Sequence, residues 1–216
     1  MLSSRRHSPV PFVQLSEVQR DALVELLNIG FGRAAAALST LTQKRVLLDV
    51  PDVAVYPMHE LTGHLDALAR DDVASVHQAF TGAVAGDALL VLEPMAASRL
   101  KELLTDEPAL PLKLDASSRE VLTETGNILL NACMGSFGNL LELPITFAVP
   151  TINVTSLHLV LDRLIAVDSE LRYALVVSAA FRLQDAEVVG SLVIILSVPS
   201  LTRLLEAVEE WERAQA

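Results

Sequence analysis

Two stretches of this chain, residues 21–41 and 120–140, carry the same polar residues at the same spacing. The shared pattern is an acid, three residues, Glu, two residues, Asn, twenty-two residues and Pro. Its members are Asp21, Glu25, Asn28 and Pro51 in the first copy, and Glu120, Glu124, Asn127 and Pro150 in the second. Because chance rarely places so spaced a pattern twice, we interpret it as an internal duplication, which constrains the fold to two related halves.

Each stretch has the periodicity of an amphipathic helix. The acid, Glu and Asn span close to two helical turns, so they line one face. Apolar residues recur on the opposite face, namely Leu23, Leu27, Phe31, Ala34, Leu38 and Leu41 in the first copy and Leu122, Leu130, Cys133, Phe137 and Leu140 in the second. Glu and Asn on a helix are ordinarily a solvated face, but their duplication favours a functional surface.

The doubled acid–Glu–Asn–Pro pattern resembles the CheC family of chemotaxis phosphatases, which act on phosphorylated CheY-type response regulators. The resemblance extends over about residues 16–213. Two copies of the motif resemble CheC more than its one-site relative CheX, within a superfamily that also contains FliY. The sequence departs from the family pattern at Glu120, where Asp or Ser is usual.

This resemblance implies a hydrolase in which Asn28 and Asn127 align water for attack on the aspartyl phosphate of the regulator. A carboxamide is no base near neutral pH, but it both donates and accepts hydrogen bonds, which suits the positioning of water. By the same resemblance, Glu25 and Glu124 pair with the lysine of the regulator site.

The remaining motif residues are expected in lesser roles. By the resemblance, Asp21 and Glu120 support the active face, and the Mg²⁺ belongs to the regulator, not to this chain. Pro51 and Pro150 are expected to be structural, since proline holds the preceding residue extended at the end of a strand. For Glu120 a second interpretation stays open, in which it completes a capping box with Ser117 as the N-cap.

Two other functions remain open at this stage. CheC-like proteins also bind the receptor deamidase CheD, so the chain could be a non-catalytic binding module for CheD or for a regulator. By analogy, a short helix at residues 157–165 would make the CheD contact. A flagellar-switch component is a third possibility, against which we count the absence of sequence after Ala216.

Composition excludes several classes of function. The chain has 216 residues, of which 51% are hydrophobic and 20% charged, so a globular fold is expected. A net charge of -11 argues against nucleic acid or an anionic membrane as partner. The lone cysteine, Cys133, suits a reducing cytoplasm, and its place on an apolar face predicts a buried hydrophobe. We expect a cytoplasmic monomer without a targeting segment.

No metal or nucleotide site is predicted. His59 and His64 are five residues apart, which does not align them on one helix face. Neither a phosphate-binding loop nor a dinucleotide fingerprint is present. The glycines in residues 28–32 fall inside the first long helix, where close helix packing explains them better than phosphate binding.

Each half is predicted to run helix, strand, helix, strand, strand, helix. The expected strands are 45–50, 74–81, 88–92, 145–149, 173–183 and 188–198, with 53–56 as a continuation of the first. Short helices are expected at 58–69 and 157–165, and further helices begin at Pro94 and Pro199. Three strands can hardly protect their own edges, so we expect both halves to share one six-stranded sheet covered by helices, an α/β (α+β) fold with pseudo-twofold symmetry.

Domain boundaries follow from the same pattern. Residues 1–15 are predicted to be a flexible arm, and residues 16–216 a single domain. Its first repeat covers about 16–107 and its second about 112–213, joined by a Pro-containing linker at 108–111. Ser16 and Gln19 predict a capping box at the start of the first helix, and Asp115 or Ser117 is expected to cap the second.

Overall fold

The computed structural model describes residues 14–49, 53–65, 72–105, 114–167, 171–183 and 186–215. Three predicted features lie outside this part of the chain: most of the arm at 1–15, Pro51 and the linker at 108–111. The end of the short helix expected at 58–69 also falls outside it, and the described helix α2 covers Met58–His64.

The centre of the molecule is one antiparallel sheet, in which the structure describes eight strands of different lengths. They are β1 (Val46–Asp49), β2 (Val53–Pro57), β3 (Asp72–Gly82), β4 (Gly86–Leu92), β5 (Ile145–Phe147), β6 (Thr151–Ser156), β7 (Leu171–Leu183) and β8 (Ala186–Ser197). The order across the sheet is β1-β7-β8-β4-β3-β5, with β2 also paired to β7 and β6 also paired to β3. The expected fold class is confirmed.

The expected six strands correspond to six positions, because each edge of the sheet is broken into two short strands. β1 and β2 pair with successive parts of β7, and β5 and β6 pair with successive parts of β3. The break between β5 and β6 contains Pro150. Proline has no N–H for the ladder, and short interrupted edges resist pairing with other chains.

The two predicted repeats exchange their edge strands. Val46 of β1, from the first repeat, pairs with Leu183 of β7, from the second. In return, β5 and β6 from the second repeat pair with β3 from the first. In the middle, Gly86 of β4 pairs with Leu196 of β8, which joins the halves directly. Neither repeat therefore completes a sheet from its own strands.

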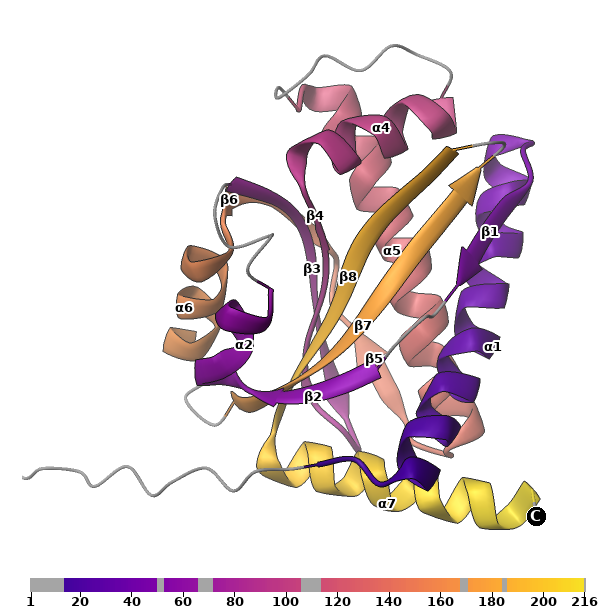
Figure 1. The fold of residues 1–216 in the computed structure, drawn as a ribbon, viewed down its shortest axis with the longest axis vertical. Helices are drawn as coiled ribbons and strands as arrows, with labels where there is room; N and C mark the ends of the chain where they lie inside the picture. Colours follow the sequence, from indigo (N-terminus) through magenta and orange to yellow (C-terminus); the bar gives the residue numbers. More distant parts are fainter. Residues whose placement is uncertain are drawn as a thin grey trace, which may run out of the picture.

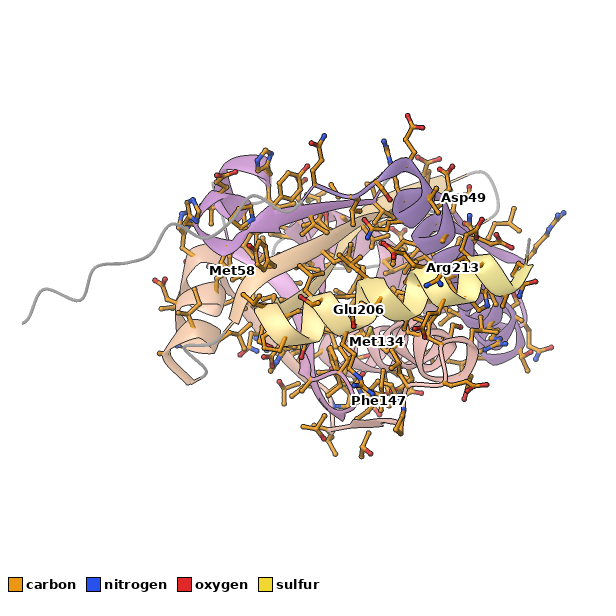
Figure 2. All side chains as sticks on the ribbon, turned by 90° about the horizontal axis from the view of Figure 1, so that it is seen from below. Asp49, Met58, Met134, Phe147, Glu206 and Arg213 are labelled. Atoms are coloured by element: carbon orange, nitrogen blue, oxygen red, sulfur yellow. The ribbon has the colours of Figure 1, made fainter. Side chains whose placement is uncertain are left out.

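Helices cover both faces of the sheet, as Figure 1 shows. Their bounds are α1 (Glu17–Thr42), α2 (Met58–His64), α4 (Pro94–Thr105), α5 (Ala116–Leu140), α6 (Leu157–Val167) and α7 (Val198–Gln215). The long helices α1 and α5 pack against one another on one face, while α2 and α6 lie on the other (Figure 1). Seen from below, α7 lies across the end of the molecule (Figure 2).

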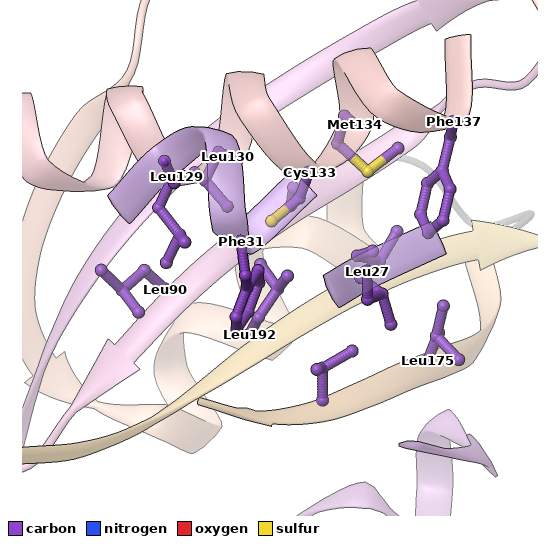
Figure 3. Close-up of a cluster of buried hydrophobic side chains, with 14 of the residues drawn as sticks. Leu27, Phe31, Leu90, Leu129, Leu130, Cys133, Met134, Phe137, Leu175 and Leu192 are labelled. Atoms are coloured by element: carbon purple, nitrogen blue, oxygen red, sulfur yellow. The ribbon is translucent and has the colours of Figure 1, made fainter. Parts of the chain in front are cut away.

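The main core lies between the sheet and the α1–α5 pair. In Figure 3, Phe31 from α1 and Leu130 from α5 point toward strand residues such as Leu192. Their side chains are fully buried, and a large buried apolar side chain contributes about 1.5–3 kcal/mol to stability. A smaller cluster around Leu61 and Leu157 lies under α2 and α6 on the opposite face.

The apolar face predicted for α1 is confirmed from Leu23 to Leu38, but the prediction for Leu41 is wrong. Leu41 is 61% exposed, because burial on α1 ends at Leu38 and the last turn carries no buried residue. α1 is also long and apolar enough to cross a membrane by length and composition. Its packing on α5 and the sheet accounts for that composition.

Candidate active site

The first copy of the motif occupies the outer face of α1. Ser16 caps this helix in the predicted capping box, accepting a hydrogen bond from the Gln19 backbone N–H at 3.1 Å. Asp21, Glu25 and Asn28 then follow on the exposed side, opposite the buried core residues. Within the described residues, none of these three side chains forms a hydrogen bond or an ion pair, so each is available to a partner.

The second copy occupies the outer face of α5. Glu120 and Glu124 are exposed and, in the part of the chain that the structure describes, neither has an ion-pair partner. Asn127 differs from Asn28, because it is half-buried and its Oδ1 accepts a hydrogen bond from Nδ2 of Asn131 at 2.7 Å. The structure thus presents two acid–Glu–Asn faces with different surroundings of the amide.

The start of α5 removes one interpretation of Glu120. Asp115 is the N-cap, and its carboxylate accepts a hydrogen bond from the Ser118 backbone N–H at 2.8 Å. Ser117 is inside the helix, so the capping box proposed for Ser117 and Glu120 is wrong. Glu120 lies in the second turn and its side chain is exposed on the same helix as Glu124.

Close packing of α1 on α5 fixes the two faces relative to each other. A Cβ on Gly30 would lie 2.9 Å from the Cα of Cys133, so only glycine permits this approach. Close helix packing is therefore confirmed for Gly30. It is wrong for Gly32, which is exposed and has no atom within 4 Å of an added Cβ.

Cys133 is part of this helix contact and has no chemical role in the site. It is fully buried, as predicted, and burial raises the pKa of the Cys133 thiol well above its usual range. A thiol that stays protonated is a poor nucleophile. Among the described residues no group of three or more His, Cys, Asp or Glu side chains could hold a metal ion.

A hollow of about 660 Å³ lies beside Asn127. Its lining includes Gln78 of β3, Asn131 of α5 and the segment of residues 145–150, which ends at Pro150. Pro150 therefore borders the space next to the second Asn, and its predicted structural role stays a prediction. The corresponding Pro51 lies outside the described residues.

Gln78 and Asn131 are site residues that sequence reasoning missed. Asn131 follows Asn127 by four residues, which is the spacing of neighbours on a helix surface, so it could have been found from the sequence. Gln78 lies between Val76 and Phe80 on the helix-facing side of β3, and its side chain is only 2% exposed. A lone amide on an apolar strand face is a weak signal that needed the structure to identify its partner.

Comparison with known proteins supports the resemblance found in the motif. A family model described as the CheC-like family matches residues 18–55, a segment that contains the whole first copy of the motif. The CheY-P phosphatase CheC of Bacillus subtilis (strain 168) is 26% identical over 146 residues, covering 66% of this chain and 69% of CheC.

The flagellar motor switch phosphatase FliY of the same organism is 38% identical over 90 residues, covering 42% of this chain but only 23% of FliY. Among solved structures, FliY of Thermotoga maritima has a TM-score of 0.69 at 17% identity, covering 94% of this chain and 99% of that one. The FliM middle domain of H. pylori has a TM-score of 0.60 at 11% identity, covering 89% and 99%. This chain is therefore a homologue of the CheC and FliY phosphatases, with a CheC-like segment at residues 18–55.

Proposed function

We propose that this chain hydrolyses the aspartyl phosphate of a CheY-type response regulator, at one site on α1 and a second on α5. The observation that carries the proposal is the duplicated pair of an exposed Glu and an Asn one helical turn later, Glu25 with Asn28 and Glu124 with Asn127. The carboxylates of this duplicated polar face have no partner in the described chain, which fits a surface that both binds a regulator and carries catalytic side chains.

The amide in each pair is the catalytic group. Hydrolysis of a phosphoryl group requires a water in line with the bond that breaks, and enzymes achieve this mainly by orientation and charge stabilisation. The Asn28 and Asn127 carboxamides can each accept a hydrogen bond from that water and donate one to a phosphoryl oxygen. Neither amide takes a proton, so the regulator's own groups supply the remaining charge.

The carboxylate in each pair sets the docking position. Glu25 and Glu124 would each form an ion pair with the lysine of the regulator site, one helical turn from the amide. Asp21 and Glu120 extend the same negative face. The approach of an acidic protein to a phosphate is favourable here because the Mg²⁺ and lysine of the regulator carry positive charge at the contact.

The relatives support this proposal. CheC of Bacillus subtilis is described as a CheY-P phosphatase, and FliY of the same organism as a flagellar motor switch phosphatase. The segment matched by the CheC-like family contains Asp21, Glu25 and Asn28.

The decisive experiment measures phosphate release from a phosphorylated CheY-type regulator. We expect the intact chain to accelerate release, and the double variant Asn28→Ala plus Asn127→Ala to lose most of the acceleration. A loss of roughly tenfold corresponds to about 1.4 kcal/mol of activation free energy, an amount that misplacement of one water can account for. The single variants then rank the two sites.

A matched control is Asn139→Ala, which removes an exposed amide from α5 outside the motif. This variant should release phosphate at the rate of the intact chain. If the intact chain accelerates release from none of several CheY-type regulators, the phosphatase proposal is wrong. Binding of a regulator or of a CheD-type deamidase without hydrolysis would then identify the chain as a binding module.

A further inference from the structure

The two sites differ in the side chains to which the Asn amide is hydrogen-bonded. At the second site a chain of three side-chain amides leads away from Asn127 to the backbone. Nε2 of Gln78 donates to the Ala148 carbonyl at 2.9 Å and to Oδ1 of Asn131 at 3.3 Å. Nδ2 of Asn131 in turn donates to Oδ1 of Asn127 at 2.7 Å. From this arrangement we infer that Asn131 and Gln78 are positioning residues that fix the amide of Asn127 for catalysis.

We call the hydrogen-bonded side chains of Gln78, Asn131 and Asn127 the amide relay. The orientation of each amide in it follows from the bond to the Ala148 carbonyl. A backbone carbonyl only accepts hydrogen bonds, so Ala148 requires the Nε2 side of the Gln78 amide. The second Nε2 hydrogen is met by an oxygen of Asn131, which leaves the Nδ2 of Asn131 to face Asn127. Asn127 therefore contributes its oxygen to the relay, and its two Nδ2 hydrogens remain for a bound phosphoryl group. Its Oδ1 retains one lone pair for the attacking water.

The close approach of α5 to the sheet makes this relay possible. A Cβ on Gly126 would lie only 2.6 Å from a methyl group of Val76 on β3, so the glycine lets the helix sit directly on the strand. Gln78 is two residues further along β3 and faces the same helix layer, where its side chain is 2% exposed. Asn127 and Asn131 are consequently brought within reach of a buried amide on β3.

The first site has no counterpart of the relay on α1. The duplication relates Asn131 to Gly32, which has no side chain and lies exposed on the helix. Gly126 corresponds to Leu27, a buried core residue. Asn28 is exposed and makes no side-chain hydrogen bond to any described residue.

The consequence for the proposed reaction is a difference in preorganisation. Asn28 must lose its side-chain freedom when a regulator binds, whereas the relay holds Asn127 in one orientation beforehand. When the amide is already oriented, less binding energy is used to order it. The gain should therefore appear as a higher kcat of the complex with the regulator. This inference rests on the proposed function for its kinetic part, but the fixed amide itself is a property of the free protein.

The kinetic test uses the Asn28→Ala background, so that only the second site contributes to phosphate release. Asn131→Leu removes both hydrogen bonds, and Asn131→Asp keeps the shape but cannot donate to Asn127. We expect each substitution to lower kcat roughly tenfold, as expected for loss of orientation. The KM should stay within about twofold for the Leu variant, because the docking carboxylate Glu124 is unchanged.

Asn139→Asp is the matched control for the added charge, since it places a carboxylate on the exposed surface of α5 away from the relay. We expect Asn139→Asp to leave kcat unchanged and to alter KM at most. Any change in KM from the added charge should be shared by Asn131→Asp. If Asn131→Asp retains the kcat of its parent, the polarity of the relay has no part in catalysis and the inference is wrong. That result would leave the proposed phosphatase activity standing.

A second measurement needs no activity. In the free, ¹⁵N-asparagine-labelled chain, the side-chain NH₂ of Asn127 should be as rigid as the backbone on the ps–ns timescale, and that of Asn28 mobile. Asn131→Leu should make Asn127 as mobile as Asn28, while the backbone spectrum of α5 keeps its dispersion. Equal mobility of both amides in the intact chain would overturn the relay. If the Asn28→Ala parent shows no phosphate release, the proposed function fails, and this measurement still decides the relay.

Discussion

At the residue scale, two glycines only two positions apart on α1 have opposite structural roles. Gly30 lies at the crossing with α5, where an added Cβ would meet the Cα of Cys133 at 2.9 Å and the carbonyl oxygen of Ala132 at 3.1 Å. Gly32 lies on the exposed side of the same helix with open space around it. One glycine therefore permits a helix contact, and the other only weakens the helix.

We predict that Gly30→Ala and Gly32→Ala change stability in opposite directions. Gly32→Ala should raise the free energy of unfolding by about 0.5–1 kcal/mol, because alanine has the higher helix propensity and clashes with nothing. Gly30→Ala should lower it by about 1–3 kcal/mol, because backbone atoms of α5 must move. Urea unfolding followed by circular dichroism measures both changes, and a stabilising Gly30→Ala would contradict the described helix crossing.

At the element scale, the start of α5 depends on one carboxylate. Asp115 accepts hydrogen bonds from the side chain and the backbone N–H of Ser118, and these lower the pKa of Asp115 below its ordinary value of 3.8. A carboxyl group with a lowered pKa stabilises the folded state above its ordinary pKa. That contribution is lost as the pH falls through the lowered value.

We therefore predict that the effect of Asp115→Ala on the Tm depends on pH. The variant should melt below the intact chain at neutral pH, and the difference should become smaller as the pH falls through the lowered pKa of Asp115, because protonation removes the charge while the neutral carboxyl group still caps the helix. Asp115→Asn is the control, since asparagine is an equally good N-cap that does not titrate. A difference for the Ala variant that stays the same from neutral to acidic pH would mean that the charge of Asp115 contributes nothing.

The elements also show what the sequence could and could not predict. Helical periodicity and the capping box at Ser16 identified α1 correctly, because both signals are local. The motif likewise identified exposed acids on both long helices, but not that Asn127 is half-buried while Asn28 is exposed. The amide relay escaped prediction because Gln78 and Asn131 are 53 residues apart and meet only through the packing of α5 on β3. The second segment of the first edge was predicted at 53–56, but β6 (Thr151–Ser156) was not, because it is paired to β3, a strand far away in the sequence.

At the scale of the whole molecule, the exchange of edge strands joins the two predicted repeats in one sheet. β1 and β2 find their only described sheet partner in β7, and β5 and β6 find theirs in β3. The helices reinforce this, since α1 packs on α5 across the repeat boundary. A half-chain would leave an unpaired strand edge and an uncovered helix face, both of which promote aggregation.

We predict that residues 1–107 and 112–216, expressed separately, show no cooperative unfolding transition. The same two segments should stay assembled when a protease site, introduced in the predicted linker at 108–111, is cut after the intact chain has folded. Size-exclusion chromatography and thermal unfolding of the cut protein measure this directly. A cooperative transition in either half alone would show that the exchanged strands are dispensable.

The exchanged strands also determine how late in synthesis on the ribosome the sheet can be completed. Val46 of β1 and Leu183 of β7 are 137 residues apart, so the first edge of the sheet stays open until most of the chain has been translated. At about 5–20 residues per second this interval is on the order of ten seconds. Until α5 (Ala116–Leu140) has been translated, the nascent chain also carries the apolar face of α1 without its cover. We therefore expect codon usage and chaperone access over this interval to affect the yield of folded protein.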